Sequence, residues 1–178
     1  NPRRHEQDST LLSSIQFFIT NSLEQRDQQL YLQNLSYSDT LTRLHNRNGY
    51  IERLNVWKKT KPERVGGIFI DLNGLKKTND EQGHEAGDRL ICRMAEILKE
   101  VFPQQAYRIG GDEFVVILPG IPEPEFDAKV QQLREALLRQ KVSAAVGSVW
   151  EPAPEDVEVL LRRADDRMYC EKEKTKRA

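Results

Sequence analysis

Three carboxylates stand where the sequence predicts that strands end. Asp71 closes the apolar run VGGIFID, while Asp112 and Glu113 directly follow Gly110 and Gly111. Hard cations such as Mg²⁺ take oxygen ligands, so acids at two neighbouring strand ends could bind them. Each feature alone is more often structural, because an Asp after a strand commonly forms a turn and Gly-Gly-Asp commonly closes a hairpin.

A glycine and two lysines after Asp71 favour phosphate binding. The chain turns at Gly74 into a predicted helix that carries Lys76 and Lys77 near its start. N–H groups at the start of a helix bind phosphate, and a neighbouring lysine adds positive charge. A full P-loop motif is absent, so this stretch is a weak signal by itself.

Two polar side chains, Asn79 and Asp88, could recognise a purine base. A carboxylate accepts two hydrogen bonds from the N1–H and N2–H₂ edge of guanine, which adenine does not offer. The structural alternatives are a helix C-cap for Asn79 and a solvated helix face for Asp88.

The elements that must position these residues alternate between helices and short strands. Apolar spacing predicts helices over residues 47–60, 73–79, 84–102, 124–140 and 155–174, and strands over 65–71, 106–109, 114–118 and 142–150. Gly110 and Gly111 are expected to supply unusual backbone angles in the hairpin between the second and third strands. This order predicts an α/β (α+β) fold close to the ferredoxin-like pattern, with a mostly antiparallel central sheet flanked by helices.

An amphipathic helix is predicted ahead of this globular part. The segment from Ser9 to about Leu35 lacks Pro and Gly, and its apolar residues recur at helical spacing. These residues are Leu12, Ile15, Ile19, Leu23 and Leu30. We expect residues 1–37 to form a signalling or dimerisation helix and residues 38–178 to form the domain. The alternative is a helix that packs on its own domain. Because the chain begins with Asn1, an upstream sensor domain is expected to be missing.

Composition excludes several function classes. The formal net charge of −1 provides no general basic field for a nucleic-acid backbone. Cys92 and Cys170 lack partners at metal-ligand spacing, which indicates free thiols in a reducing compartment. No apolar run reaches the roughly 20 residues of a membrane helix, so we expect no membrane segment in this fragment and a cytoplasmic location.

Four sequence blocks, taken together, resemble the GGDEF family of diguanylate cyclases. They are DTLTRLHNR at 39–47, DLNGLKKTND at 71–80, GHEAGD at 83–88 and RIGGDEF at 108–114. The blocks follow the order and spacing of the family and cover roughly residues 38–177. The resemblance implies a nucleotidyl-cyclase palm that condenses two GTP into cyclic di-GMP, releasing two pyrophosphates. It also implies a homodimer, because each domain holds one GTP and therefore half of the site.

The resemblance further implies roles for individual residues. The catalytic residues are Asp71, Asp112 and Glu113, and two Mg²⁺ or Mn²⁺ ions are bound by these acids and the backbone carbonyl of Leu72. Glu113 is alternatively a base for the attacking hydroxyl. The guanine-recognising residues are Asn79 and Asp88. The ribose and phosphates are contacted by Gly111, Leu75, Lys76, Lys172 and Lys176. The role of Arg108 is open.

Some positions depart from the family pattern. Asn73 replaces a frequent Asp, and Thr175 replaces a frequent Gly. Lys176 stands where Arg is frequent, so it keeps the charge but loses the guanidinium fork. The product-inhibition motif Arg-x-x-Asp, which ends six residues before the Gly pair, is replaced by Val101 and Gln104. We therefore predict that this inhibitory site is absent.

Three alternatives to an active diguanylate cyclase remain. One is a non-catalytic GTP-binding GGDEF domain that regulates a larger signalling protein. Another is a cyclase of the same architecture that makes a different cyclic nucleotide. The third, from another functional class, is a purely structural dimerisation module.

Overall fold

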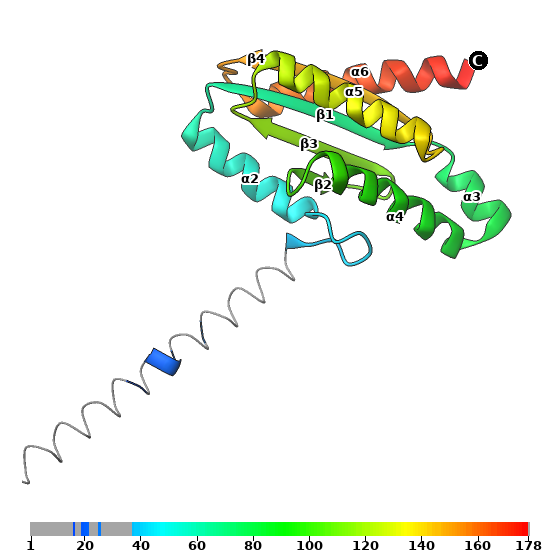
Figure 1. The fold of residues 1–178 in the computed structure, drawn as a ribbon, viewed down its shortest axis with the longest axis horizontal. Coiled ribbons are helices and arrows are strands. Elements are labelled where there is room, and N and C mark those ends of the chain that lie inside the picture. The colour runs from blue at the N-terminus through cyan, green and yellow to red at the C-terminus, as the bar shows by residue number, and fades with distance from the viewer. Residues whose placement is uncertain (1–15, 17–18, 22–24, 26–36, 178) are drawn as a thin grey trace, which may run out of the picture. The chain divides into compact units, whose positions relative to one another are not determined.

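A four-stranded sheet in the order β2-β3-β1-β4 forms the centre of the domain (Figure 1). The computed structural model describes residues 16, 19–21, 25 and 37–177. The strands are β1 (Arg64–Leu72), β2 (Ala106–Arg108), β3 (Glu113–Pro119) and β4 (Ala144–Pro152). All neighbouring strands are antiparallel. This strand order and connectivity confirm the predicted ferredoxin-like arrangement.

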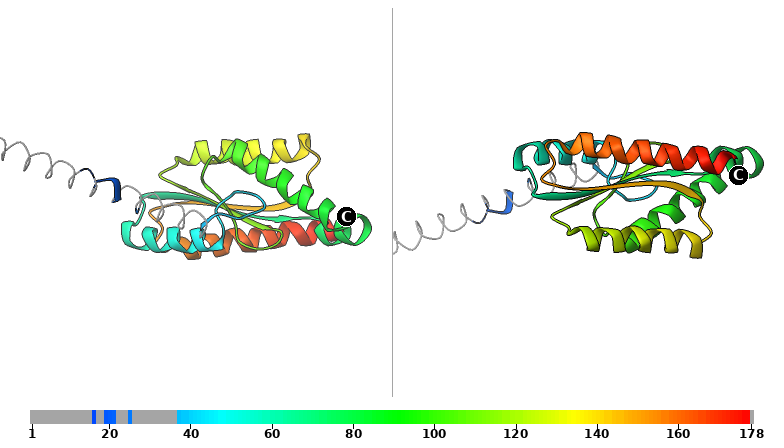
Figure 2. Two further views of the ribbon diagram at one scale, coloured as in Figure 1. Left: turned by 90° about the horizontal axis from the view of Figure 1, so that it is seen from below. Right: turned by 90° about the horizontal axis from the view of Figure 1, so that it is seen from above.

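Five helices surround this sheet in the described part of the domain. They are α2 (Arg47–Thr60), α3 (Leu75–Gln82), α4 (His84–Val101), α5 (Glu123–Arg139) and α6 (Val157–Arg177). Figure 2 shows α4 and α5 on one face and α2 and α6 on the other. None of the helices in the described residues has the length and apolar character needed to cross a bilayer.

The alternation of side chains along β3 divides the core into two layers. Phe114, Val116 and Leu118 pack into the cluster that includes the apolar residues of α4 and α5. Val115 and Ile117 point to the opposite face, where they join residues of α2 and α6. Because successive side chains of a strand point to opposite faces, an uninterrupted apolar run indicates a strand that is covered on both sides.

Most predicted boundaries differ from the observed ones by one to three residues, and two of these shifts have a visible backbone cause. The helix predicted from residue 73 begins instead at Leu75, because Gly74 adopts a left-handed conformation with φ 77°. The last strand begins at Ala144 rather than residue 142. Lys141 has φ 55°, and Val142 donates its N–H to the carbonyl of Leu137, so the chain is still turning away from α5 there.

The chain divides into two units, residues 1–36 and 37–178. Most of the predicted N-terminal helix lies outside the described residues, and its signalling role stays a prediction. The described residues of this segment, 16, 19–21 and 25, are helical, and the hydroxyl of Thr20 donates to the carbonyl of Gln16 at 2.9 Å.

Candidate active site

Sheet pairing brings together the acids that the sequence predicts to do chemistry. Asp71 lies near the end of β1, opposite Glu113 of β3 in the antiparallel register. The next residue, Leu72, donates its N–H to the carbonyl of Asp112 at 2.9 Å. Two acidic positions from separate parts of the sequence therefore meet at one end of the sheet.

The carboxylate of Asp71 is almost completely buried. The residue is 6% exposed, and its Oδ2 accepts a hydrogen bond from Lys172 Nζ at 2.6 Å. Its Oδ1 is buried and has no hydrogen-bond partner in the described part of the chain. A buried carboxylate oxygen without a partner is costly, and it fits a hard cation, which takes oxygen ligands.

The predicted metal ligands are not assembled as a cluster in this structure. Among the described residues, no three His, Cys, Asp or Glu side chains are arranged to hold a metal ion. The ammonium of Lys172 instead contacts Asp71. The metal-binding roles of Asp71, Leu72, Asp112 and Glu113 remain predictions.

The hairpin tip places Glu113 in a negative environment. Burial, together with the negative charges of Asp112 and Asp71, raises the pKa of Glu113 above its ordinary value. A Cβ at Gly110 would meet the carboxylate of Glu113, so a larger residue there would displace this side chain. The expectation of unusual backbone angles at Gly110 and Gly111 was wrong, because neither has a positive φ.

A pocket of about 640 Å³ opens beside these acids. Its lining includes five residues predicted from the sequence: Leu72, Leu75, Lys76, Asp112 and Lys172. Gly74 caps α3 without a side-chain hydrogen bond, so the N–H groups of the first helical turn can donate hydrogen bonds to an anion. Asp80, the last residue of the family-like block 71–80, and its neighbour Glu81 also line the pocket, and neither was predicted as a site residue.

The two predicted guanine-recognising residues do not line this pocket. Asn79 is half-buried in α3, and its carboxamide oxygen lies so close to Gly87 of α4 that a Cβ there would overlap it. Asp88 follows Gly87 and is exposed. Asn79 therefore lies within α3 and is not its C-cap, which was the structural alternative. Its side chain contacts Gly87, the residue before Asp88.

Two further residues, Gly111 and Lys176, were predicted to contact the nucleotide. Gly111 also lies outside the pocket lining, and a Cβ at this position would have open space around it. Lys176 belongs to α6, but its side chain lies outside the described part of the structure.

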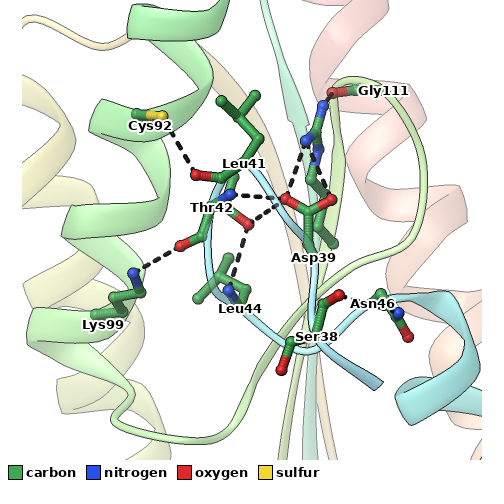
Figure 3. A network of polar contacts seen from close by, with 10 residues as sticks. Ser38, Asp39, Leu41, Thr42, Leu44, Asn46, Cys92, Lys99 and Gly111 are labelled. Carbon is green, nitrogen blue, oxygen red and sulfur yellow. Dashed lines mark hydrogen bonds and ion pairs between the residues drawn. The ribbon is translucent and has the colours of Figure 1, made fainter. Parts of the chain in front are cut away.

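Arg108, whose role the sequence left open, connects the hairpin to the start of the domain. Figure 3 shows the polar contacts around Asp39 and Thr42. Its Nη1 lies 3.1 Å from Asp39 Oδ1, and its Nη2 donates to the carbonyl of Gly111 at 2.9 Å. Thr42 donates both its N–H and its hydroxyl to Asp39 Oδ1, at 2.8 and 2.6 Å. Asp39 and Arg108 both belong to the family-like sequence blocks. This was the sequence observation that could have linked the two residues to the site.

The hydrogen bonds around Asp39 also affect its titration. Burial by itself would raise the pKa of this carboxyl. The hydrogen bonds from Thr42 and the guanidinium of Arg108 outweigh burial and hold the pKa below its ordinary value of 3.8. Asp39 is therefore held as a carboxylate at neutral pH.

The family comparison agrees with this combination of fold and site. The model described as "Diguanylate cyclase, GGDEF domain" matches residues 36–178. The chain belongs to the GGDEF family. Solved structures of similar fold include the diguanylate cyclase SiaD from Pseudomonas aeruginosa, in complex with its activator SiaC. Its TM-score is 0.75 at 25% identity, over 97% of this chain and 72% of that chain.

Other GGDEF relatives carry different names. The chain is 31% identical to the probable diguanylate cyclase DgcT of Escherichia coli over 79% of its length, and it spans 34% of that protein. It is 29% identical to the cyclic di-GMP phosphodiesterase PdeR of the same organism over 86% of its length, and it spans 25% of that protein. DgcB from Caulobacter crescentus, solved with c-di-GMP, supports the fold alone: its TM-score is 0.77 at 20% identity, over 92% of this chain and 94% of that chain.

Proposed function

We propose that this GGDEF domain condenses two molecules of GTP into cyclic di-GMP and releases two pyrophosphates. The observation that carries the proposal is the meeting of Asp71 and the Asp112 hairpin beside a pocket that also contains Lys76 and Lys172. Carboxylates next to cationic groups suit a triphosphate substrate that is bound together with divalent cations.

In this proposal the residues of the chain position the substrate more than they react with it. Phosphoryl transfer depends mainly on alignment of the attacking hydroxyl and on neutralisation of phosphate charge. Lys76 and the first turn of α3 hold the terminal phosphates, and Lys172 and Lys176 add positive charge. Asn79 and Asp88 hold the guanine base. The backbone of Gly111 contacts the ribose and phosphates.

The acidic residues would hold Mg²⁺ or Mn²⁺, two per site. Asp71, the carbonyl of Leu72, Asp112 and Glu113 are the proposed ligands, and the unpartnered Oδ1 of Asp71 supports this assignment. When bound, the cations would neutralise phosphate charge on both sides of the displacement. Glu113 is alternatively the base for the 3′-hydroxyl, because its position opposite Asp71 places its carboxylate at the same end of the sheet.

Catalysis requires two copies of the domain, because each holds one GTP and the 3′-hydroxyl of one must reach the α-phosphorus of the other. The predicted N-terminal helix would then control how two domains meet. Deletion of residues 1–37 is expected to change both the specific activity and its dependence on protein concentration. If neither quantity changes, the proposed control by the helix is wrong.

A second candidate function is a non-catalytic GGDEF domain that binds GTP and regulates an attached partner. Its support is the relative PdeR, a named phosphodiesterase of which this chain spans only a quarter. The presence of acids at all three proposed catalytic positions favours the cyclase.

A turnover assay separates the two functions. The chain is incubated with GTP and Mg²⁺ or Mn²⁺, and the products are identified by mass spectrometry. We expect cyclic di-GMP from the wild type and none from Asp112→Ala, whose melting temperature should be unchanged because a hairpin tip contributes little packing. Asp127→Ala, an exposed acid on α5 outside the pocket, is the matched control and should retain activity. GTP binding without any product would support the regulatory function.

A further inference from the structure

Lys172 and Asp71 form an ion pair inside the proposed active site. The Nζ of Lys172 lies 2.6 Å from Asp71 Oδ2, and the two side chains are 27% and 8% exposed. In the proposed function, however, these residues bind different partners: Lys172 binds phosphate and Asp71 binds a cation. The observed pair therefore differs from the contacts that the proposed function gives these two residues.

The ion pair has a clear electrostatic cause. A carboxylate as buried as that of Asp71 is costly without a compensating charge or hydrogen bond. Among the described side chains, none donates to its Oδ1 and Lys172 donates to its Oδ2, so Lys172 is the described cation that compensates this carboxylate. A divalent cation at the same carboxylate would be repelled by an ammonium at hydrogen-bond distance. The two cations consequently compete for Asp71.

Lys172 can leave Asp71 by moving its side chain alone. The side chain lines the same pocket as Lys76 and Asp112, and a lysine carries its charge on a flexible stem. The neighbouring part of α6 is anchored to β4. Glu171 accepts from Arg134 Nη2 at 2.8 Å and from the N–H of Val146 at 3.2 Å. The helix backbone can therefore stay in place while the ammonium changes partner.

We propose that Lys172 is an exchangeable counter-ion of Asp71, which transfers to the phosphates of the nucleotide when a divalent cation binds the carboxylate. The inference rests on the proposed function and adds a coupling between the two ligands. The phosphates of the nucleotide give Lys172 an alternative anionic partner. The divalent cation then supplies the positive charge beside Asp71 that Lys172 supplied before it moved. By thermodynamic linkage, each ligand raises the affinity for the other by the same factor.

The coupling is tested by measuring Mn²⁺ binding to the full chain by electron paramagnetic resonance, with and without a non-hydrolysable GTP analogue. In the wild type, the analogue should tighten Mn²⁺ binding at least about fivefold, the lower end of typical coupling. Lys172→Gln keeps a hydrogen-bond donor for Asp71 but removes the competing charge. Without nucleotide, this variant should bind Mn²⁺ at least about fivefold more tightly than the wild type. The analogue should increase the Mn²⁺ affinity of the variant by a smaller factor than it increases that of the wild type.

Lys174→Gln is the matched control, because Lys174 is exposed on the same helix and lines a different pocket. It should bind Mn²⁺ as the wild type does. Melting temperatures provide a second measurement: Mn²⁺ alone should stabilise Lys172→Gln more than it stabilises the wild type.

Two results would overturn the inference. One is a Lys172→Gln variant that binds Mn²⁺ no more tightly than the wild type. The other, which needs no variant, is a wild type whose Mn²⁺ affinity is the same with and without the analogue. Neither measurement depends on turnover. A wild type that makes cyclic di-GMP but fails these tests contradicts only the counter-ion exchange, whereas a chain that makes no product contradicts the proposed function.

Discussion

Arg108 and Asp39 form an ion pair, in which Nη1 of the guanidinium contacts both carboxylate oxygens and joins β2 to the loop at the beginning of the domain. The two side chains are only 12% and 21% exposed. The same guanidinium donates to the carbonyl of Gly111, in the hairpin that carries the proposed catalytic acids. The pair therefore supports both the stability of the domain and the position of the hairpin.

Removing Asp39 should destabilise the domain strongly. Asp39→Ala leaves a largely buried guanidinium without its carboxylate and removes the acceptor of two Thr42 hydrogen bonds. We expect the free energy of unfolding to fall by about 3 kcal/mol, measured by urea denaturation. Glu100→Ala is the control, because its ion pair with Arg139 is mostly exposed and should contribute less than about 1 kcal/mol. Equal losses in the two variants would contradict the structural role of Asp39.

The stabilisation by Asp39 should depend on pH in the acidic range. The pKa of this carboxyl is lowered in the folded protein, so its contribution is fully present above the ordinary value of 3.8 and is lost as pH falls through the folded pKa. The stability difference between the wild type and Asp39→Asn should therefore shrink below about pH 3.8. Denaturation at a series of pH values measures this difference. A difference that stays constant from neutral pH down to pH 2 is the opposing result.

The guanine preference should depend on Asp88. Asp88→Ala removes the carboxylate proposed to accept from guanine, so discrimination of GTP from ATP should weaken by about 1–3 kcal/mol. Competition binding with both nucleotides measures this change. Glu85→Ala, which alters another exposed acid on the first turn of α4, should leave discrimination unchanged. If the unmutated domain binds both nucleotides equally, the guanine assignment is wrong.

Cyclic di-GMP should not inhibit the proposed activity by binding at the position of the family's inhibitory motif. Val101 is buried in the core at 6% exposure, and Gln104 carries no charge to hold a cyclic dinucleotide. Initial rates should therefore be the same for the wild type and Gln104→Ala at every concentration of added cyclic di-GMP. A calorimetric titration that places cyclic di-GMP at Gln104, away from the nucleotide pocket, would refute this prediction.

Local sequence patterns were sufficient to predict the fold. The run from Phe114 to Leu118 is apolar at every position, which is typical of a strand covered on both faces, and the structure confirms this. The start of β4 was not predicted because Lys141 turns the chain with a positive φ that no glycine marks.

Contacts between distant residues limited the prediction of the site. Asp71 was placed by the end of an apolar strand, but its pairing with Lys172 joins residues 101 positions apart. The pairing of Asp39 with Arg108 likewise spans 69 positions. Such contacts depend on the register of the strands and on the placement of the helices. Neither can be derived from the spacing of residues along the chain.

The central claim is that Asp71 and Asp112 share divalent cations beside a bound guanosine triphosphate. Crystals grown with Mn²⁺ and a non-hydrolysable GTP analogue test it directly through the anomalous scattering of manganese. We predict manganese peaks within about 2.0–2.6 Å of both carboxylates and next to the phosphates. Manganese bound elsewhere, or carboxylates too far apart to share an ion when the nucleotide is in place, would contradict the account.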